Sequence, residues 1–293
     1  MAVLTAVVAV GAVGACGSEQ PPPAGPEGIV ATITTPPRTS SATTAPSTPA
    51  PTNADSWYLA LGDSLAAGMQ PTTGDQPQRG YAGPVLTALR QKTPGTALKN
   101  LGCSGETTTS MLKGGLCRYP EGSQVAAAVA FLEANADKTR LVTLDLGANN
   151  VLRCATPAVD HACATSTTTT VAADLKAVLG QIRAVAPKVP VVLLTYYNPL
   201  LAGYRQGPDG KAIAADSQPL LASLNTVIGN AAEAAGGKVA DVAGAFATTN
   251  STGSPEPVNV QRICAWTWMC SRGDIHANDD GYAAMAKAVA AQL

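Results

Sequence analysis

Apolar runs that alternate with helical segments constrain the fold of this chain most. Five short runs are rich in large apolar residues, and they lie at 57–62, 97–102, 141–147, 189–196 and 238–242. Most are continuous rather than alternating, which is typical of parallel strands covered on both faces. Helical patterns follow at 83–92, 123–136, 169–185, 219–235 and 280–293. The order predicts a three-layer α/β/α domain with right-handed crossovers.

The first 16 residues resemble an export signal. The apolar run 2–15 is too short to span a bilayer comfortably and fits the apolar region of a signal peptide. It ends in Val13-Gly14-Ala15-Cys16, which resembles the lipobox of bacterial lipoproteins, where the cysteine becomes the lipidated N-terminus. No Lys or Arg precedes the run, so an uncleaved anchor or an incidental cysteine in an ordinary signal peptide stays open. We expect a protein that is lipid-anchored at the extracytoplasmic face of the membrane, or secreted.

Residues 17–55 are dominated by Pro, Thr, Ser, Ala and Gly. Such a segment buries too little apolar surface to offset the entropy lost on ordering. We therefore expect a disordered stalk over 17–55, followed by one folded domain over 56–293.

The cysteines support export. The chain has seven, and the six that follow Cys16 form close pairs in the sequence: Cys103 and Cys117, Cys154 and Cys163, Cys264 and Cys270. Six cysteines allow several connectivities, and the local spacing favours pairing between neighbours. Small disulfide loops suit an oxidising compartment. A metal site is a weak alternative, because the chain has only two histidines and no Cys-x-x-Cys motif.

Charge argues against a nucleic-acid partner. The formal net charge is −1, and the 19 Lys and Arg residues form no runs. A protein that binds nucleic acid normally shows a basic stripe.

Polar blocks follow the first three predicted strands and precede the last predicted helix. They are Gly62-Asp63-Ser64, the stretch 100–108, Gly147-Ala148-Asn149-Asn150 and Asp274-Ile275-His276. Active sites of parallel α/β sheets lie outside the carboxyl ends of the strands, so these blocks should meet at one rim. Together they supply a hydroxyl nucleophile, a base, an acid to orient the base, and donors for an oxyanion.

In this order, the four blocks resemble those of the SGNH hydrolases, also called the GDSL family of esterases and lipases. The resemblance covers Ser56 to Leu293 and is far more specific than a lone Gly-Asp-Ser tripeptide. The G-x-S-x-G elbow of α/β-hydrolases is absent around Ser64. The resemblance implies a flavodoxin-like domain with a five-stranded parallel sheet in the order 2-1-3-4-5.

The same resemblance implies catalytic roles for individual residues. It places the nucleophile at Ser64 and the base at His276. The oxyanion hole would comprise the backbone N–H groups of Ser64 and Gly105 and the side-chain amide of Asn149. A role for Ser64 as a plain helix cap is the alternative that the tripeptide alone leaves open.

Two positions depart from the family pattern. Asn150 stands where the family usually has Asp. The family acid often lies three residues before the histidine, where this chain has Gly273. We therefore expect Asp274, two residues before His276, to orient the imidazole, and a backbone carbonyl is the alternative.

Other side chains near the rim allow two interpretations. Tyr196 and Tyr197 follow the fourth strand, and Trp266 and Trp268 lie between Cys264 and Cys270. These four aromatic residues could bind substrate or cover the edge of the core. Asp145 interrupts the third apolar run, and we expect a buried carboxylate with a structural role.

Taken together, the sequence predicts a serine esterase that cleaves carboxylic esters through a Ser-His-Asp triad and an acyl-enzyme. The substrate would be a small-molecule, lipid or glycan ester. No metal or organic cofactor is expected, the protein should be a monomer, and it should meet the membrane only through its lipid. An acyltransferase would need the same residues, and a non-catalytic envelope lipoprotein stays open because fold alone does not establish function.

Overall fold

The computed structural model of the protein describes residues 54–155 and 158–293. The predicted signal peptide, its Cys16 and residues 17–53 of the predicted stalk lie outside the described residues.

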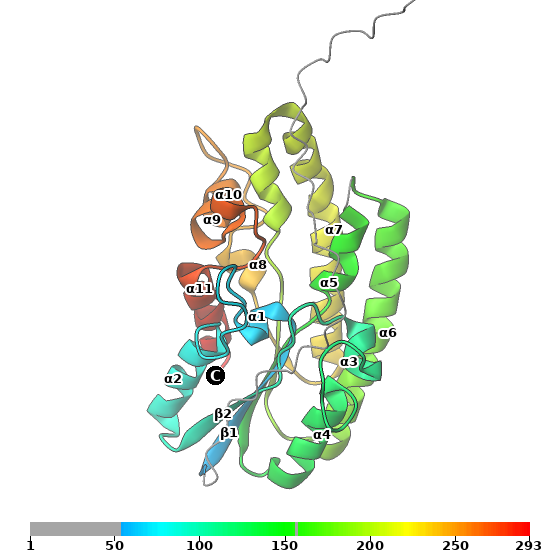
Figure 1. Ribbon diagram of the computed structural model, residues 1–293, viewed down its shortest axis with the longest axis vertical. Coiled ribbons are helices and arrows are strands. Elements are labelled where there is room, and N and C mark those ends of the chain that lie inside the picture. The colour runs from blue at the N-terminus through cyan, green and yellow to red at the C-terminus, as the bar shows by residue number, and fades with distance from the viewer. Residues whose placement is uncertain (1–53, 156–157) are drawn as a thin grey trace, which may run out of the picture. The chain divides into compact units, whose positions relative to one another are not determined.

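Five parallel strands form a single sheet (Figure 1). They are β1 (Ser56–Gly62), β2 (Thr96–Asn100), β3 (Thr139–Asp145), β4 (Val191–Leu194) and β5 (Lys238–Ala240). The strand order is β2-β1-β3-β4-β5, which confirms the predicted order. All seven residues of β1 are buried, as expected for a central strand covered on both faces.

Five longer helices cover the sheet. They are α2 (Ala82–Lys92), α4 (Gln124–Asn135), α6 (His161–Val185), α7 (Gly207–Ala234) and α11 (Asp279–Ala290). Helices α2 and α11 pack together on one face, and α4, α6 and α7 form a layer on the other (Figure 1). The predicted three-layer α/β/α architecture is therefore confirmed.

Short helices fill the connections. They are α1 (Ser64–Ala67), α3 (Thr108–Lys113), α5 (Ala148–Val151), α8 (Val242–Ala245), α9 (Val258–Trp266) and α10 (Met269–Arg272), with 3₁₀ helices η1 (Leu152–Ala155) and η2 (Pro199–Gln206). Apart from the helix after Ser64, which the helix-cap alternative implies, none of them was predicted, because so few turns carry too little periodicity to be recognised in a sequence. Helices α1 and α5 follow β1 and β3 almost directly and so lie at the carboxyl ends of the central strands.

Two helices begin earlier than predicted. Helix α6 begins at His161 rather than at 169, because Asp160 caps it by accepting the backbone N–H of Cys163 at 2.9 Å. Its threonine-rich first half has low helix propensity and conceals the helix from pattern analysis. Helix α7 begins at Gly207 and continues through Pro219, where the sequence suggested a start. Buried Ala214 and Ser217 precede that proline, so packing outweighs its local cost.

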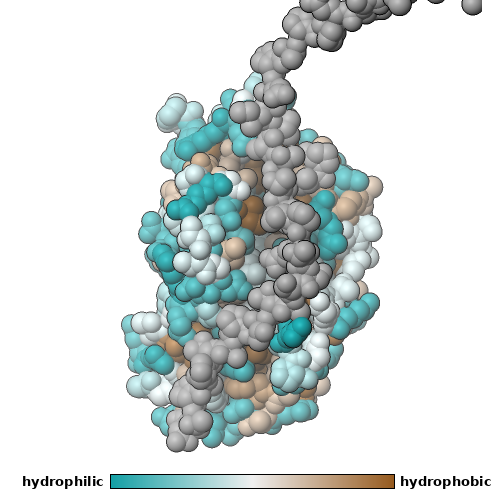
Figure 2. All heavy atoms as spheres, in the orientation of Figure 1, coloured by the Kyte–Doolittle hydropathy of each residue, from teal (hydrophilic) through white to brown (hydrophobic). Residues whose placement is uncertain are grey.

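The surface of the domain is mixed. On the face shown in Figure 2, hydrophilic and hydrophobic residues are interspersed. Of the helices that the structure describes, none combines the length and the apolar character needed to cross a bilayer.

Three disulfides join the cysteines as predicted: Cys103–Cys117, Cys154–Cys163 and Cys264–Cys270. The first spans 14 residues and links the end of β2 to the loop before α4. It therefore encloses the whole loop that carries Gly105 and helix α3.

We expect the double substitution Cys103→Ala and Cys117→Ala to lower the free energy of unfolding by about 3 kcal/mol, because a loop of this length is constrained in the unfolded chain. Chemical denaturation of the oxidised protein measures this change. An unfolding free energy equal to that of the wild type would show that the 103–117 loop is held by its other contacts alone.

Candidate active site

Three of the predicted catalytic residues line one cleft at the carboxyl ends of the central strands. They are Ser64 after β1, Asn149 after β3 and His276 before α11. The cleft is lined by Asp63, Ser64, Leu65, Ala148, Asn149, Leu152, Tyr196, Tyr197, Pro199, Leu221, Ile275 and His276. Segments more than 200 residues apart in the chain thus meet at the rim where the strand pattern placed them.

The turn that presents Ser64 depends on its two preceding residues. Gly62 has a φ of +136°, and a Cβ there would lie 2.1 Å from the backbone oxygen of Asp145. Asp63 caps α1, since its Oδ1 accepts the backbone N–H of Leu65 at 3.0 Å. Ser64 is therefore the first residue of the helix rather than its cap, and the helix-cap alternative is wrong. Its position at a helix N-terminus suits a developing negative charge.

His276 and Asp274 form a compact pair in the loop between α10 and α11. The Oδ1 atom of Asp274 lies 2.8 Å from Nδ1 of the imidazole and accepts the backbone N–H of His276 at 2.9 Å. Because Asp274 engages Nδ1, Nε2 is the ring nitrogen left for the cleft. Partial burial alone would raise the pKa of Asp274, but its hydrogen bonds with His276 outweigh burial and lower that pKa below its usual value.

Two of the predicted oxyanion donors, Gly105 and Asn149, are linked through Glu106. Gly105 has a φ of +86° in a tight turn, where the backbone N–H of Glu106 bonds to the oxygen of Cys103 at 3.0 Å. The Nδ2 atom of Asn149 donates to the backbone oxygen of Glu106 at 3.0 Å. Gly105 is not among the residues that line the cleft, but it directly precedes the hydrogen-bond partner of Asn149. One N–H of the Asn149 amide thus fixes its orientation and leaves the second for a ligand.

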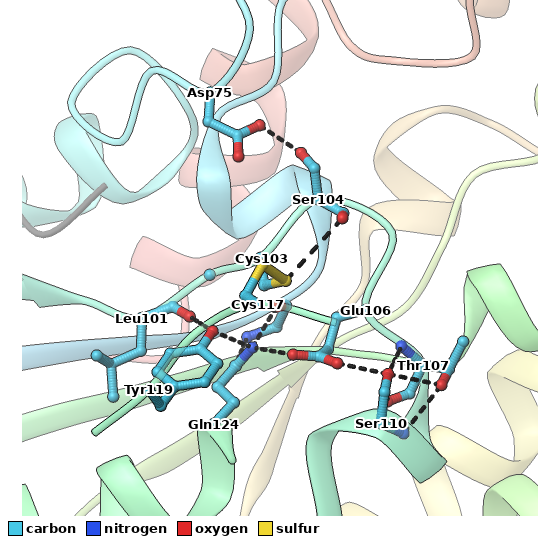
Figure 3. The surroundings of a disulfide bond; sticks show 12 residues. Asp75, Leu101, Cys103, Ser104, Glu106, Thr107, Ser110, Cys117, Tyr119 and Gln124 are labelled. Atoms are coloured by element: carbon cyan, nitrogen blue, oxygen red, sulfur yellow. Dashed lines mark hydrogen bonds between the residues drawn. A yellow bond between two sulfur atoms is a disulfide. The ribbon is translucent and has the colours of Figure 1, made fainter. Parts of the chain in front are cut away.

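A buried polar network connects this turn to Gly62 at the end of β1. Figure 3 shows the part of it that joins Glu106, Gln124 and Ser110. The Nε2 atom of Gln124, the first residue of α4, donates to the carboxylate of Glu106 at 3.0 Å. The same side chain accepts the N–H of Gly62 at 2.7 Å and donates to its oxygen at 3.0 Å. Burial raises the pKa of Glu106. Sequence reasoning missed Gln124, because a glutamine at the start of a helix carries no distinctive signal.

Asn150, which departs from the family pattern, links α5 to α3. Its Oδ1 accepts the backbone N–H of Thr108 at 3.0 Å, and its Nδ2 donates to Thr108 Oγ1 at 3.1 Å. An amide can serve both bonds at once, whereas an ionised carboxylate only accepts.

Of the four aromatic residues proposed to bind substrate, Tyr196 and Tyr197 line the cleft, and Trp266 and Trp268 are not among the lining residues. Helix α9 ends on Trp266, and its ring packs edge-on against Phe246, with centroids 5.2 Å apart. Its position therefore fits the core-edge alternative.

Trp268 makes a polar contact instead. Its Nε1 donates to Oε1 of Gln70 at 3.1 Å. The amide of Gln70 in turn donates to the backbone oxygen of Ala277, next to His276, at 3.4 Å.

Asp145 is wholly buried directly below the Ser64 turn, as the interrupted apolar run predicted. Its Oδ2 accepts the backbone N–H groups of Asp63 and Ala66, each at 3.2 Å, and its Oδ1 accepts the hydroxyl of Tyr81 at 2.5 Å. Asp145 thereby fixes the backbone on both sides of Ser64. Burial, together with the nearby Asp63, raises the pKa of Asp145 well above its usual value.

This raised pKa predicts a pH-dependent cost in stability. Above the unfolded-state pKa of Asp145, the unfolded chain releases a proton that the folded protein retains, so the free energy of unfolding falls as pH rises. The side-chain oxygen of an asparagine at this position can accept both backbone N–H groups. The Tyr81 hydroxyl can then donate to Oγ1 of Thr143, which lies 3.3 Å away. We expect Asp145→Asn to raise the thermal midpoint at pH 8 by about 2–4 °C, equivalent to about 1 kcal/mol, and to change it little at pH 4. Thermal unfolding at both pH values tests this, and an equal shift at the two would contradict it.

Within the described residues, no three His, Cys, Asp or Glu side chains gather closely enough to hold a metal ion.

Comparison with known proteins gives one family and one fold. Residues 60–284 match the model of the GDSL-like lipase/acylhydrolase family. None of the curated proteins compared matches this chain.

Several solved structures share the fold. An extracellular lipase from Streptomyces rimosus is 21% identical, with 81% of this chain and 100% of that chain covered and a TM-score of 0.55. A phospholipase A1 from Streptomyces albidoflavus is 22% identical, with 82% and 100% covered and a TM-score of 0.52. A lipase from a goat rumen metagenome is 18% identical, with 81% and 97% covered and a TM-score of 0.54. At sequence identities of 18–22%, the similarity to these structures shows a shared fold alone.

Proposed function

Because this chain belongs to the GDSL-like lipase/acylhydrolase family, we propose that it is a serine esterase that hydrolyses carboxylic esters through an acyl-enzyme. The observation that carries the proposal is the convergence of Ser64, Asn149 and His276 in one cleft, with Nδ1 of His276 held by Asp274 at 2.8 Å. A nucleophile beside a base that a third group orients is the arrangement that acyl transfer requires.

In the first half of the reaction, Nε2 of His276 takes the proton of the Ser64 hydroxyl while Oγ attacks the ester carbonyl carbon. Negative charge moves to the carbonyl oxygen. The backbone N–H groups of Ser64 and Gly105 and the free N–H of Asn149 stabilise it, and each such donor is worth roughly 10²–10³ in rate. The carbon–oxygen bond to the alcohol then breaks, and His276 returns the proton to the leaving alcohol.

In the second half, His276 takes a proton from water, and the resulting hydroxide attacks the acyl-enzyme carbonyl. The tetrahedral intermediate collapses, the acid leaves, and Ser64 Oγ regains its proton from His276. Asp274 stabilises the imidazolium that forms in each half. We propose that a monomer is the functional unit.

Labelling with a fluorophosphonate tests the proposal, since this probe reacts only with an activated serine. We expect the purified protein to hydrolyse p-nitrophenyl acetate and to lose that activity as the probe binds, with peptide mapping locating the label at Ser64. Hydrolysis without a label at Ser64 would refute the assignment, and a protein that neither hydrolyses esters nor is labelled would be a binding protein.

We further propose that the protein is an exported lipoprotein, anchored through Cys16. Three disulfides in the domain support an oxidising compartment. Mass spectrometry of the N-terminal peptide from a membrane fraction tests this. A lipid-modified Cys16 at the mature N-terminus is the expected result, and a mature chain that begins elsewhere or carries an unmodified Cys16 would refute it.

A further inference from the structure

We propose that the acyl pocket of this site accepts only short acyl groups, from acetyl to about butyryl. The inference rests on the proposed esterase function and specifies its substrate class. It is carried by the size of the cleft beside Ser64 and by the way the walls of that cleft are held.

The cleft is small. Its cavity volume is about 30 Å³. This is far below the roughly 300–1,000 Å³ of pockets that bind drug-sized ligands. Beside the polar groups of Ser64, Asn149 and His276, its lining includes apolar side chains, among them Leu65, Ala148, Leu152 and Leu221. A cleft of this size with an apolar side suits a methyl or a propyl group better than a long alkyl chain.

The first wall is Tyr196, which is fixed at both its backbone and its side chain. Its hydroxyl donates to Asp63 Oδ2 at 2.7 Å. The side chain of Asn225 on α7 accepts the Tyr196 N–H at 2.7 Å and donates to its oxygen at 2.9 Å. A longer acyl chain could displace this ring only by breaking a hydrogen bond to a buried carboxylate, which is costly.

The second wall is Tyr197, held by packing as well as by hydrogen bonding. Its hydroxyl donates to the backbone oxygen of Ile275 at 2.8 Å, between Asp274 and His276. Its ring stacks on Phe246, with centroids 4.4 Å apart, and Phe246 is itself fully buried. Movement of Tyr197 would therefore disturb both the core and the loop that carries the catalytic histidine.

Leu221 supplies the apolar wall from α7. It is 1% exposed and lies among the lining residues, whereas its neighbour Leu220, which is 2% exposed, does not line the cleft. Both leucines lie next to each other on one helix and are equally buried, so they form a matched pair for mutation.

The first test is the specificity constant of the wild type for p-nitrophenyl acetate, butyrate, octanoate and laurate. One methylene group that a pocket cannot accommodate changes specificity by about 10–200-fold. We therefore expect kcat/KM to fall at least about 10-fold between butyrate and octanoate. Equal or rising values from acetate to laurate would overturn the short-acyl proposal.

The second test enlarges the pocket. Leu221→Ala should raise the ratio of octanoate to acetate specificity by about 10-fold or more, because it removes the wall against which a longer chain would stop. Leu220→Ala creates a similar cavity in the core but should leave the ratio unchanged. If Leu221→Ala does not fold, the wild-type series alone decides the question. Identical ratios in two folded variants would refute the role of Leu221.

Labelling of Ser64 by a small fluorophosphonate separates this proposal from the proposed function. A labelled protein that prefers long acyl chains is a serine esterase with a pocket other than the one proposed. A protein that is neither labelled nor active on any ester overturns both proposals.

Discussion

Replacing Ser64 with alanine is expected to lower kcat/KM for p-nitrophenyl acetate by at least about 10⁴-fold, because removal of a catalytic serine leaves only the donors of the oxyanion hole. The loss should appear in kcat. The fold should persist, since Asp63 rather than Ser64 caps α1 and Asp145 holds the backbone on both sides of Ser64. Initial rates measured beside circular dichroism spectra test both parts.

Ser271→Ala is the matched control for this prediction. Ser271 is an exposed serine on α10, close in sequence to the Asp274–His276 loop, and the same hydroxyl is removed there. Its activity should stay within about twofold of the wild type, as is usual for surface substitutions. A folded Ser64→Ala variant that kept comparable activity would mean that another group attacks the ester.

The sheet could be predicted from the sequence because its central strands, β1, β3 and β4, are almost wholly buried. Such strands must be continuously apolar, and they are short, so each apolar run identified one strand to within two or three residues. Right-handed crossovers and the position of the polar blocks then determined where the rim of the sheet lies.

The supports of the site could not be predicted in the same way. Gln124 and Asn225 bind backbone atoms of Gly62 and Tyr196, which are distant in sequence, and nothing in the residues around either side chain indicates those partners. Trp266 lies only ten residues before His276 in the sequence, but its ring packs against Phe246, a contact that no local pattern indicates. Local patterns therefore located the chemical groups, while long-range side-chain to backbone bonds determine how rigidly these groups are held.

The structure shows which acid contacts His276, a point that the sequence motif leaves open. The family pattern favours an acid three residues before the histidine, and this chain has Gly273 there. Gly273 instead ends α10 with a φ of +66°, which lets the chain turn so that Asp274 reaches the imidazole from only two residues away. The left-handed backbone conformation of Gly273 thus compensates for the shorter spacing. An aspartate at this position would adopt that conformation only at an energetic cost.

Replacing Asp274 with asparagine is expected to lower kcat for p-nitrophenyl acetate by about 10²–10⁴-fold with little change in KM, because the imidazolium formed in the transition state loses its counter-charge. Asparagine retains an oxygen that can accept both Nδ1–H and the backbone N–H of His276, so the variant tests the charge more than the geometry. Because the pKa of Asp274 lies below its usual value, its carboxylate is ionised in the neutral pH range, so the wild type carries this counter-charge under the conditions of the assay.

Asp280→Asn provides the control, since it removes the same charge from an exposed position in the first turn of α11. We expect it to retain wild-type kcat, which would separate the local effect of Asp274 from the change in net charge. If Asp274→Asn also kept kcat within about threefold of the wild type, the charge of Asp274 would have no part in the reaction. The hydrogen bond from Nδ1–H, which asparagine can still accept, would then be enough to orient His276.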